Sequence, residues 1–339
     1  MKIQYIAFCS NSNSFWDDKL KDLNFTKKYP GASWLPYLAK FSEKSGVNLI
    51  SGKKALDAMI LPEKILVIQE LNSRHGRKLI NRGSTPFIIM SGESKLYAYY
   101  FYDFFNFFSR RFKFKLSFFD KNYNFEHFNF PSFSSENLKQ NNNEWDKRNF
   151  SILVAANKSH VSSFPKGSLK SKIKYLILFF YKMISPSFRL AKKNSLHLKR
   201  FEIIEFFGEK NKLKLYGSNW DNSKIYPKSK KEKLIQIIRE LNPSIINDKI
   251  EALKNYRFCF CIENTKIEGY VTEKIIESIY AGCIPVYFGA KNINNYIPDN
   301  AFIDGSKFKK LNDLYNYMIN LSEINAKKII QNGFNFLAS

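Results

Sequence analysis

Short apolar runs alternate with stretches of helical spacing along the chain, and polar turns separate them. In the first half, apolar runs cover residues 2–9, 48–52, 64–71 and 85–94. Residues 35–44 have the spacing of a helix. Apolar strands separated by helical stretches predict an α/β sheet with parallel or mixed strands.

The second half repeats this pattern more clearly. Strand-like runs cover residues 150–157, 212–220, 257–264 and 283–289, and helical runs cover 195–209, 243–256 and 271–282. The polar, aperiodic segment 134–149 between the halves is typical of a linker. We therefore predict two Rossmann-like domains that face each other across a cleft, with residues 1–149 in the first and 150–339 in the second.

A basic insertion at about 160–195 interrupts the second domain. Its lysines surround the apolar run Tyr175–Tyr181, which is too short to span a bilayer. One interpretation is an amphipathic helix lying on an anionic membrane. The other is a structural helix with a solvated basic edge.

The charge balance is strongly positive, with 54 Lys and Arg against 30 Asp and Glu. Such a field attracts nucleic acid, an anionic membrane or phosphorylated small molecules, although biased coding also produces lysine-rich chains. Four cysteines stand at positions 9, 259, 261 and 283, without a C-x-x-C pair or a nearby histidine. We expect small buried side chains in a reducing compartment rather than a metal site.

The stretch "CIENTKIEGYVTEK" combines a strand end with a helix start. Glu263 and Asn264 stand at the carboxyl end of an apolar run, where ligands bind in open α/β sheets. After a turn at Gly269, Thr272 is expected to cap a helix through its hydroxyl, which puts Glu273 and Lys274 in the first turn. A lysine there opposes the helix dipole unless an anion is bound, so we predict a phosphate site. A solvated surface pair is the alternative.

Residues 256–290, "YRFCFCIENTKIEGYVTEKIIESIYAGCIPVYFGA", closely resemble the donor-binding signature of the α-1,3/4-fucosyltransferases, glycosyltransferase family 10. Weaker matches follow in the same order: "MSGES" at 90–94, the helix around Arg200 and "LYGSNW" at 215–220. The resemblance implies the GT-B type of fold, GDP-fucose as donor and transfer with inversion. We expect a bacterial or viral-type member of this family, without the membrane-anchored stem of animal members.

The resemblance also implies roles for the donor-binding residues. Lys274 and Arg200 would offset the charge that develops on the pyrophosphate. Glu273 and Asn264 would bond the ribose hydroxyls, and Tyr270 would pack near the base or ribose. The helix register leaves a shift of one position open at Arg200.

Two further carboxylates are part of the implied site. Glu93 would be the base that takes the proton of the acceptor hydroxyl, and a simple turn carboxylate is the alternative. Glu263 would either bind the donor or lie behind the residues that do. The chain contains no D-x-D motif, so we expect no cofactor and no essential divalent metal.

The resemblance implies a glycan acceptor, with GlcNAc or Glc in a LacNAc-like or lipopolysaccharide glycan and an α-1,3 or α-1,4 linkage. We expect a cytoplasmic protein that contacts the inner face of the membrane peripherally. One alternative is a transferase for another GDP-sugar. A second is a basic nucleic-acid-binding protein, suggested by "FFSRRFKFKLSFF" at 107–119, but no nucleic-acid module is recognisable and we expect no such partner.

Overall fold

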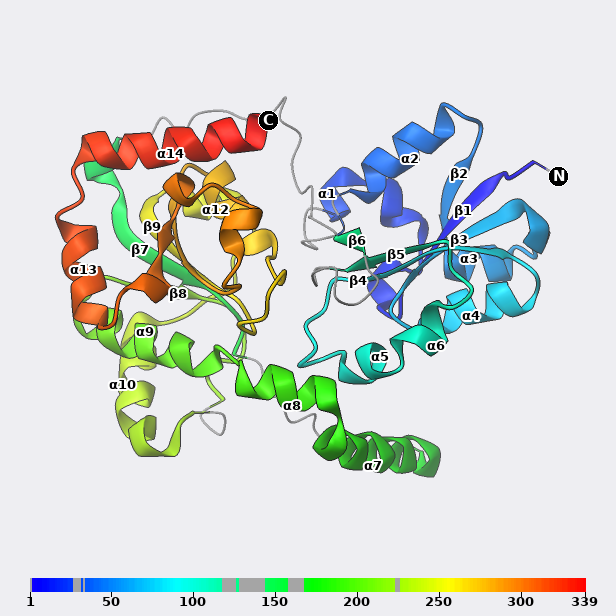
Figure 1. Ribbon diagram of the computed structural model, residues 1–339, viewed down its shortest axis with the longest axis horizontal. Helices are drawn as coiled ribbons and strands as arrows, with labels where there is room; N and C mark the ends of the chain where they lie inside the picture. Colours follow the sequence, from blue (N-terminus) through cyan, green and yellow to red (C-terminus); the bar gives the residue numbers. More distant parts are fainter. Residues whose placement is uncertain are drawn as a thin grey trace. The chain divides into compact units, whose positions relative to one another are not determined.

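The chain folds into two compact α/β units in a computed structural model (Figure 1). The structure describes residues 2–26, 32, 34–117, 126–127, 144–157, 168–222 and 226–339. The first unit is Met1–Ser132 with Phe179–Leu190, and the second is Phe133–Leu178 with Ala191–Ser339. Most of the predicted linker 134–149 lies outside the described residues, so the predicted boundary at residue 150 stays a prediction.

The first unit contains a six-stranded sheet in the order β2-β1-β3-β4-β5-β6, in which all pairs are parallel. Its strands are β1 (Tyr5–Cys9), β2 (Asn48–Ser51), β3 (Ile65–Glu70), β4 (Thr85–Ser91), β5 (Phe114–Ser117) and β6 (Glu126–His127). Its helices before the insertion are α1 (Leu23–Thr26), α2 (Leu35–Glu43), α3 (Gly52–Asp57), α4 (Arg74–Asn81), α5 (Tyr99–Asp103) and α6 (Phe105–Ser109).

Alternation along β1 divides the core of this unit into two layers. Ala7 and Cys9 pack on one side with the cluster that includes Phe101 of α5, and Phe8 packs on the other side with Leu35 of α2. Successive side chains of a strand point to opposite faces, so a run that is apolar at every position needs helices on both faces. The sheet is accordingly covered on both sides.

The second unit contains a five-stranded parallel sheet in the order β11-β10-β9-β7-β8. Its strands are β7 (Asn149–Val154), β8 (Lys214–Tyr216), β9 (Tyr256–Ile262), β10 (Ile284–Phe288) and β11 (Ile303–Asp304). Its helices after the insertion are α9 (His197–Glu209), α10 (Lys231–Leu241), α11 (Lys249–Leu253), α12 (Glu273–Tyr280), α13 (Leu311–Ile319) and α14 (Glu323–Ala338). Two Rossmann-like sheets confirm the predicted fold class.

Of two further details predicted from the sequence, the structure confirms one and contradicts the other. Cys259 and Cys261 are free and buried on one face of β9, as predicted. The helix predicted over residues 243–256 is wrong in length. It begins only after Asp248, whose side chain accepts the backbone N–H of Glu251 at 3.1 Å. That carboxylate caps the helix and fixes its start.

The basic insertion forms two helices, α7 (Leu169–Ile184) and α8 (Pro186–Lys193), and its residues 160–167 lie outside the described part. The helix boundary at Ser185 is anchored in the first unit. Asp103 of α5 accepts the Tyr181 hydroxyl at 2.7 Å and the backbone N–H of Ser187 at 3.0 Å. The insertion, which was expected to belong to the second domain, therefore also packs on the first.

In each sheet, the direction in which successive strands are added reverses once. Such a reversal is where doubly wound sheets bind ligands. The first sheet reverses between β1 and β3, and the second between β7 and β9. In doubly wound sheets, ligands bind outside the carboxyl ends of the strands that flank such a reversal. Residues directly after β1, β3, β7 and β9 are therefore the first candidates for function.

The turn after β8 brings two backbones into close contact at the second reversal point. Gly217 has a φ of +130°, and a Cβ atom there would lie 2.0 Å from the carbonyl oxygen of Ala155. The same oxygen accepts the indole N–H of Trp220 at 2.8 Å. Trp220 therefore packs within the fold, and Gly217 is required for the close approach.

We expect Gly217→Ala to lower the free energy of unfolding by about 1–3 kcal/mol from backbone strain alone, with the clash adding to this. Gly46→Ala is the matched control, because Gly46 also has a positive φ of 71° but has open space around its Cα. Urea unfolding followed by tryptophan fluorescence measures both. Equal losses in the two variants would show that the contact with Ala155 is unimportant.

Candidate functional site

The end of β9 and the start of α12 meet through a buried carboxylate. Glu263, which is completely buried, accepts the backbone N–H of Thr272 at 2.8 Å and the Thr272 hydroxyl at 2.9 Å. The ammonium group of Lys274 lies 3.0 Å from the same carboxylate. Burying a carboxylate is costly unless it is paired and hydrogen-bonded, and here both conditions are met.

The prediction that Thr272 caps α12 through its hydroxyl is wrong. Thr272 is the residue at the N-cap position, but its side chain makes no capping bond. Its hydroxyl instead donates to Glu263 and accepts the ammonium group of Lys274 at 2.7 Å. The Thr272 hydroxyl oxygen accepts a charged ammonium donor in place of the backbone N–H that a cap would bond, while its proton is donated to Glu263.

Room for this network comes from a glycine after β10. A Cβ atom at Gly289 would lie 2.1 Å from the hydroxyl oxygen of Tyr287 and 2.8 Å from Cγ of Glu263. The Tyr287 hydroxyl also accepts the backbone N–H of Ala290 at 3.0 Å. The glycine in "PVYFGA" therefore allows Tyr287 and Glu263 to pack against the backbone.

Lys274 lies between two carboxylates in the first turn of α12. Its ammonium group is 3.0 Å from Glu263 and 3.6 Å from Glu273. Burial lowers the pKa of Lys274, but Glu263 and Glu273 outweigh it, and the net pKa is above the ordinary value. Burial raises the pKa of Glu273, but the charges of Lys274 and Lys249 lower it by more, so the net pKa is below the ordinary value. Both groups are therefore charged at neutral pH.

Arg200 reaches the same region from α9. Its Nη2 atom donates to the carbonyl oxygen of Ile262 at 3.1 Å and to Oδ1 of Asn264 at 2.9 Å. Nδ2 of Asn264 in turn donates to the Tyr270 hydroxyl at 3.2 Å. Arg200 bonds the residues on either side of Glu263, and Lys274 bonds Glu263 itself, so both cations lie at the end of β9.

The loop after β9 is held so that these contacts form. Thr265 makes an isolated antiparallel bridge with Ser195, just before α9. Gly269, with a φ of 76°, donates its backbone N–H to Oδ1 of Asn292 at 3.0 Å. The positive φ confirms the predicted turn at Gly269. Distant parts of the sequence thereby bring Arg200 to the residues that follow β9.

The structure thus gathers all the predicted donor-binding residues in the second unit: Arg200, Glu263, Asn264, Tyr270, Glu273 and Lys274. Their direct contact with a donor stays a prediction. The internal bonds of Glu263 favour the alternative in which it lies behind the residues that contact the donor. Cationic groups beside a helix N-terminus at a sheet reversal can bind a phosphate group.

In the first unit, the predicted base Glu93 follows β4, and its carbonyl oxygen accepts the Tyr102 hydroxyl at 2.8 Å. Sequence reasoning missed Glu70, the last residue of β3, whose carboxylate accepts the Ser10 hydroxyl at 2.5 Å. Burial raises the pKa of Glu70, Ser10 opposes this, and the charge of Glu93 adds to it.

Two signals could have revealed more of this site. Glu70 ends "KILVIQE" in the same way that Glu263 ends "RFCFCIE", and both positions flank a strand-order reversal. Lys95 stands two residues after Glu93 and is buried. Burial lowers the pKa of Lys95 to about 8, with Asp103 opposing it.

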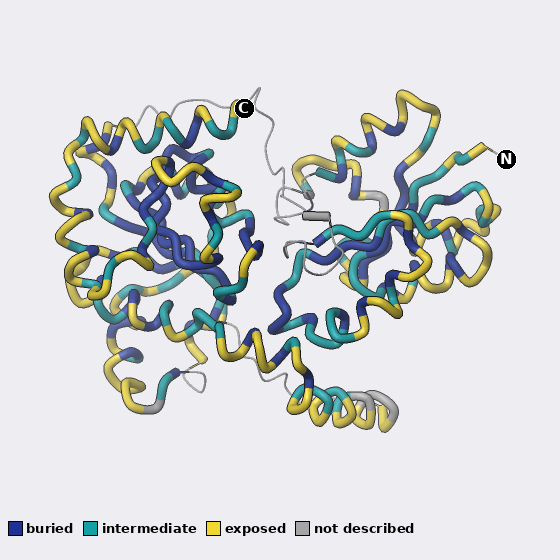
Figure 2. The backbone as a smooth tube through the Cα atoms, in the orientation of Figure 1, coloured by how far each residue is buried: buried dark blue, intermediate teal, exposed yellow. Residues whose placement is uncertain are grey.

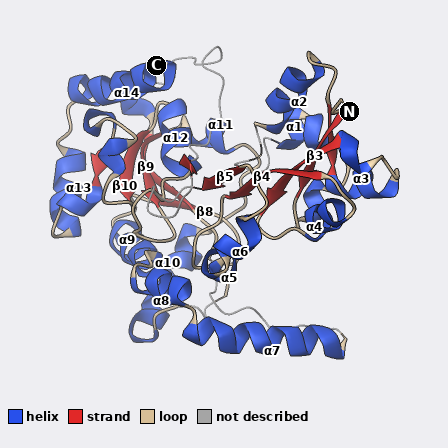
Figure 3. Cartoon of the chain, turned by 45° about the vertical axis from the view of Figure 1, so that its right-hand side comes forward, coloured by secondary structure: helices blue, strands red, loops and turns tan. Residues whose placement is uncertain are grey.

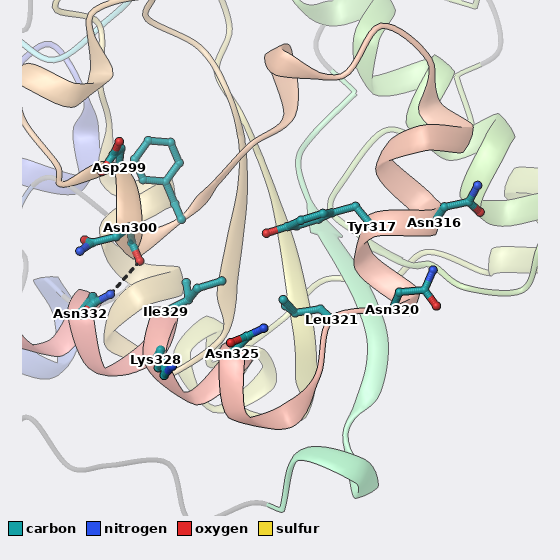
Figure 4. A pocket seen from close by; sticks show the side chains of 11 residues that line it. Asp299, Asn300, Asn316, Tyr317, Asn320, Leu321, Asn325, Lys328, Ile329 and Asn332 are labelled. Carbon is teal, nitrogen blue, oxygen red and sulfur yellow. Dashed lines mark hydrogen bonds between the residues drawn. The ribbon is translucent and has the colours of Figure 1, made fainter.

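A separate cavity in the second unit, of about 570 Å³, contains none of the predicted residues. It is lined by side chains of α13, α14 and the 3-10 helix Asp299–Ala301, and many of them are asparagines (Figure 4). Asp299–Ala301 precedes β11, so this cavity is near the starts of the parallel strands. It is therefore distinct from the cluster after β9.

Comparison with known proteins finds a family match over part of the chain. Residues 190–328 match the family description "Glycosyltransferase family 10 (fucosyltransferase) C-term". This match covers less than half of the chain, so residues 190–328 resemble the C-terminal domain of glycosyltransferase family 10. The matched region includes α9, β9 and α12, and therefore every residue of the cluster after β9.

Curated relatives of family 10 align over short stretches. An alpha-(1,4)-fucosyltransferase of Arabidopsis thaliana is 42% identical over 72 residues, which are 21% of this chain and 18% of that protein. The alpha-(1,3)-fucosyltransferase FucT of Helicobacter pylori is 34% identical over 73 residues, or 22% of this chain and 15% of that protein. The alignments thus span less than a fifth of these relatives' own length.

Solved structures extend the likeness of fold over the whole chain. A crystal structure of an alpha1,3-fucosyltransferase superposes with a TM-score of 0.51 at 15% identity, covering 100% of this chain and 82% of that one. An alpha-glucosyltransferase in complex with UDP and DNA superposes with a TM-score of 0.56 at 12% identity, covering 99% and 94%. The chain has the GT-B fold, as predicted.

The ion pair between Glu263 and Lys274 can be tested by a double-mutant cycle. We expect Lys274→Met to lower the free energy of unfolding by about 3–5 kcal/mol, because it leaves a buried carboxylate without its cation. Glu263→Gln combined with Lys274→Met should recover most of this loss. Urea unfolding measures the cycle, and Lys327→Met of the exposed pair with Glu323 is the control.

A simple additive result in this cycle would contradict the pairing. The control variant should change the unfolding free energy by no more than about 0.5 kcal/mol, since exposed pairs contribute little.

Proposed function

We propose that this protein is a member of glycosyltransferase family 10 and an inverting fucosyltransferase that moves L-fucose from GDP-fucose to a hydroxyl group of a glycan. The observation that carries the proposal is the cluster after β9, in which Arg200 bonds Asn264 and Lys274 bonds Glu263 beside the N-terminus of α12. The likeness to fucosyltransferases over the family domain supports fucose as the sugar.

The donor diphosphate would bind at the first turn of α12. When the bond between the anomeric carbon and the phosphate oxygen breaks, the bonding electrons remain on GDP. Lys274, Arg200 and the free backbone N–H groups of the helix would stabilise this negative charge. Glu273 and Asn264 would bond the ribose hydroxyls, and Tyr270 orients Asn264 through its hydroxyl.

Glu263 has a supporting role in this proposal. Its carboxylate fixes the Lys274 side chain and the backbone of Thr272, so it holds the first turn of α12 in place. Positioned groups lower a barrier more than mobile ones, because they need no reorganisation when charge develops. Removing Glu263 would therefore weaken donor binding without removing a donor contact.

The acceptor hydroxyl would attack the face of the sugar opposite the leaving GDP, which inverts the anomeric carbon. Its proton passes to the carboxylate of Glu93 in this proposal. Glu70 would lie behind Glu93 and influence its charge. All groups needed for the displacement are side chains and backbone amides, so we propose that no divalent metal is essential.

The acceptor and the cellular location of the protein are also proposals. We infer a GlcNAc or Glc residue of a LacNAc-like or lipopolysaccharide glycan, linked α-1,3 or α-1,4, because the relatives carry α-1,3 and α-1,4 activities in their names. A cytoplasmic protein that contacts the inner face of the membrane would meet such a glycan on a lipid carrier. Of the helices that the structure describes, none is long and apolar enough to cross a bilayer.

Calorimetric titration with GDP, GDP-fucose, GDP-mannose and UDP tests the donor site. We expect GDP and GDP-fucose to bind, and Glu263→Gln with Lys274→Met to reduce their affinity at least about tenfold through loss of the cation. The paired replacement avoids the unpaired buried charge that Lys274→Met alone would leave. Lys327→Met should bind normally.

Absence of GDP binding by the folded chain would contradict the fucosyltransferase proposal. Binding of GDP-mannose with transfer of mannose would instead favour a transferase for another GDP-sugar.

Replacing the two carboxylates of the first unit identifies the base. We expect Glu93→Gln to leave the affinity for GDP unchanged and to reduce fucose transfer by about 10²–10⁴-fold, the usual contribution of a general base. Glu70→Gln is the matched variant and should reduce transfer much less. Transfer is measured with radiolabelled GDP-fucose and a LacNAc acceptor. The reverse order of effects would assign the base to Glu70.

A further inference from the structure

Helix α7 exposes large apolar side chains along its whole length. Five of them are more than half exposed: Leu169 at 74%, Ile177, Phe180 and Met183 at 62%, and Ile184 at 63%. Figure 3 shows α7 as one unbroken helix, and Figure 2 shows its outer turns as exposed. Contiguous apolar surface of this kind marks an interaction site.

The exposed side chains lie on one side of the helix. At about 100° per residue, the arc from Phe179 through Leu169 to Ile177 spans about 160°. Ile173 and Leu176 also lie within this arc and are exposed. Single apolar residues are ordinary on a protein surface, but a continuous apolar arc on one helix indicates an interaction surface.

The opposite side of α7 packs against the rest of the fold. Tyr181 bonds Asp103 at 2.7 Å, and its ring stacks on Phe104 with the centroids 5.5 Å apart. Lys182 is half-buried, with its ammonium group 4.5 Å from the ring centroid of Phe188. Because α7 packs through this side, its apolar arc faces outward. The exposed edge is therefore mainly apolar, which argues against a structural helix with a solvated basic edge.

The charges around the arc indicate what covers it. No Asp or Glu occurs between residues 147 and 201, and residues 169–193 contain seven Lys and Arg. Among the described side chains, Lys172, Arg189, Lys192 and Lys193 are exposed. A wide apolar arc that includes one exposed lysine, Lys172, and is followed by a second basic helix without carboxylates is the pattern of a segment that lies in the interface of an anionic bilayer.

A second copy of the chain suits this surface less well. Pairing two α7 helices would bring two sets of cations together without any carboxylate on either helix to offset them. Spanning the bilayer is also excluded, because the 16 residues of α7 are too few.

We propose that the apolar arc of α7 inserts into the headgroup region of an anionic phospholipid membrane, with the helix axis parallel to the membrane plane. Phe180 and Ile177 enter the acyl boundary, and the surrounding lysines and arginines contact lipid phosphates. Because Asp103 bonds Tyr181 and Ser187, insertion of α7 also holds the first unit at the membrane. This surface acts whether or not the donor is GDP-fucose.

Vesicle flotation of the full chain tests the proposal. We expect binding to vesicles of equal parts phosphatidylcholine and phosphatidylglycerol, little binding to pure phosphatidylcholine, and release at high salt. Ile177→Glu with Phe180→Glu should reduce binding at least about tenfold, because two buried apolar side chains are replaced by charges. Met59→Glu with Ile245→Glu is the matched control, since these side chains are 83% and 76% exposed outside α7.

A charge variant and a mass measurement complete the test. Lys172→Gln should weaken binding to the anionic vesicles roughly fivefold and leave binding to neutral vesicles unchanged. Circular dichroism confirms that each variant is folded. Vesicle binding that is absent in the native chain, or unchanged by the α7 double variant, would overturn the proposal. So would a dimer in light scattering that the α7 double variant converts to a monomer.

Discussion

The buried carboxylate of Glu263 is the constraint on which the cluster after β9 depends. Its two oxygens bond the backbone and hydroxyl of Thr272 and the ammonium group of Lys274, so one side chain joins the end of β9 to the start of α12. A carboxylate with no exposure is stable only with such partners. The packing of Gly289 and the position of Lys274 both follow from this requirement.

The sequence could predict the parts of the fold that depend on local pattern. "RFCFCIE" alternates phenylalanine and cysteine up to a carboxylate, which is sufficient to predict a buried strand that ends at a site. The hydroxyl of Thr272 was misassigned because its partner, Glu263, stands nine residues earlier. Glu70 was missed although it also ends an apolar run, since only the strand order shows that it flanks a reversal. Contacts between distant residues, such as Tyr181 with Asp103, have no local signal.

The excess of positive charge lies outside the cluster after β9. Arg200, Lys249 and Lys274 are balanced there by Glu263, Glu273 and Glu277, so three cations meet three carboxylates and the cluster is formally neutral. The net charge of +24 must therefore come from the rest of the chain. The segment that contains α7 and α8 supplies part of it without any acidic residue, which agrees with a surface for anions much larger than a nucleotide.

A neutral cluster also determines how a diphosphate would bind. Lys274 is held by Glu263 and Glu273 in the structure, and those bonds keep its pKa raised and its position fixed. An incoming phosphate would therefore share a lysine that is already paired, and the backbone N–H groups of α12 would supply the attraction that the carboxylates cancel. Specific recognition at short range and attraction at long range are then separate properties of different residues. The first depends on one strand end and one helix start, and the second on the basic surface as a whole.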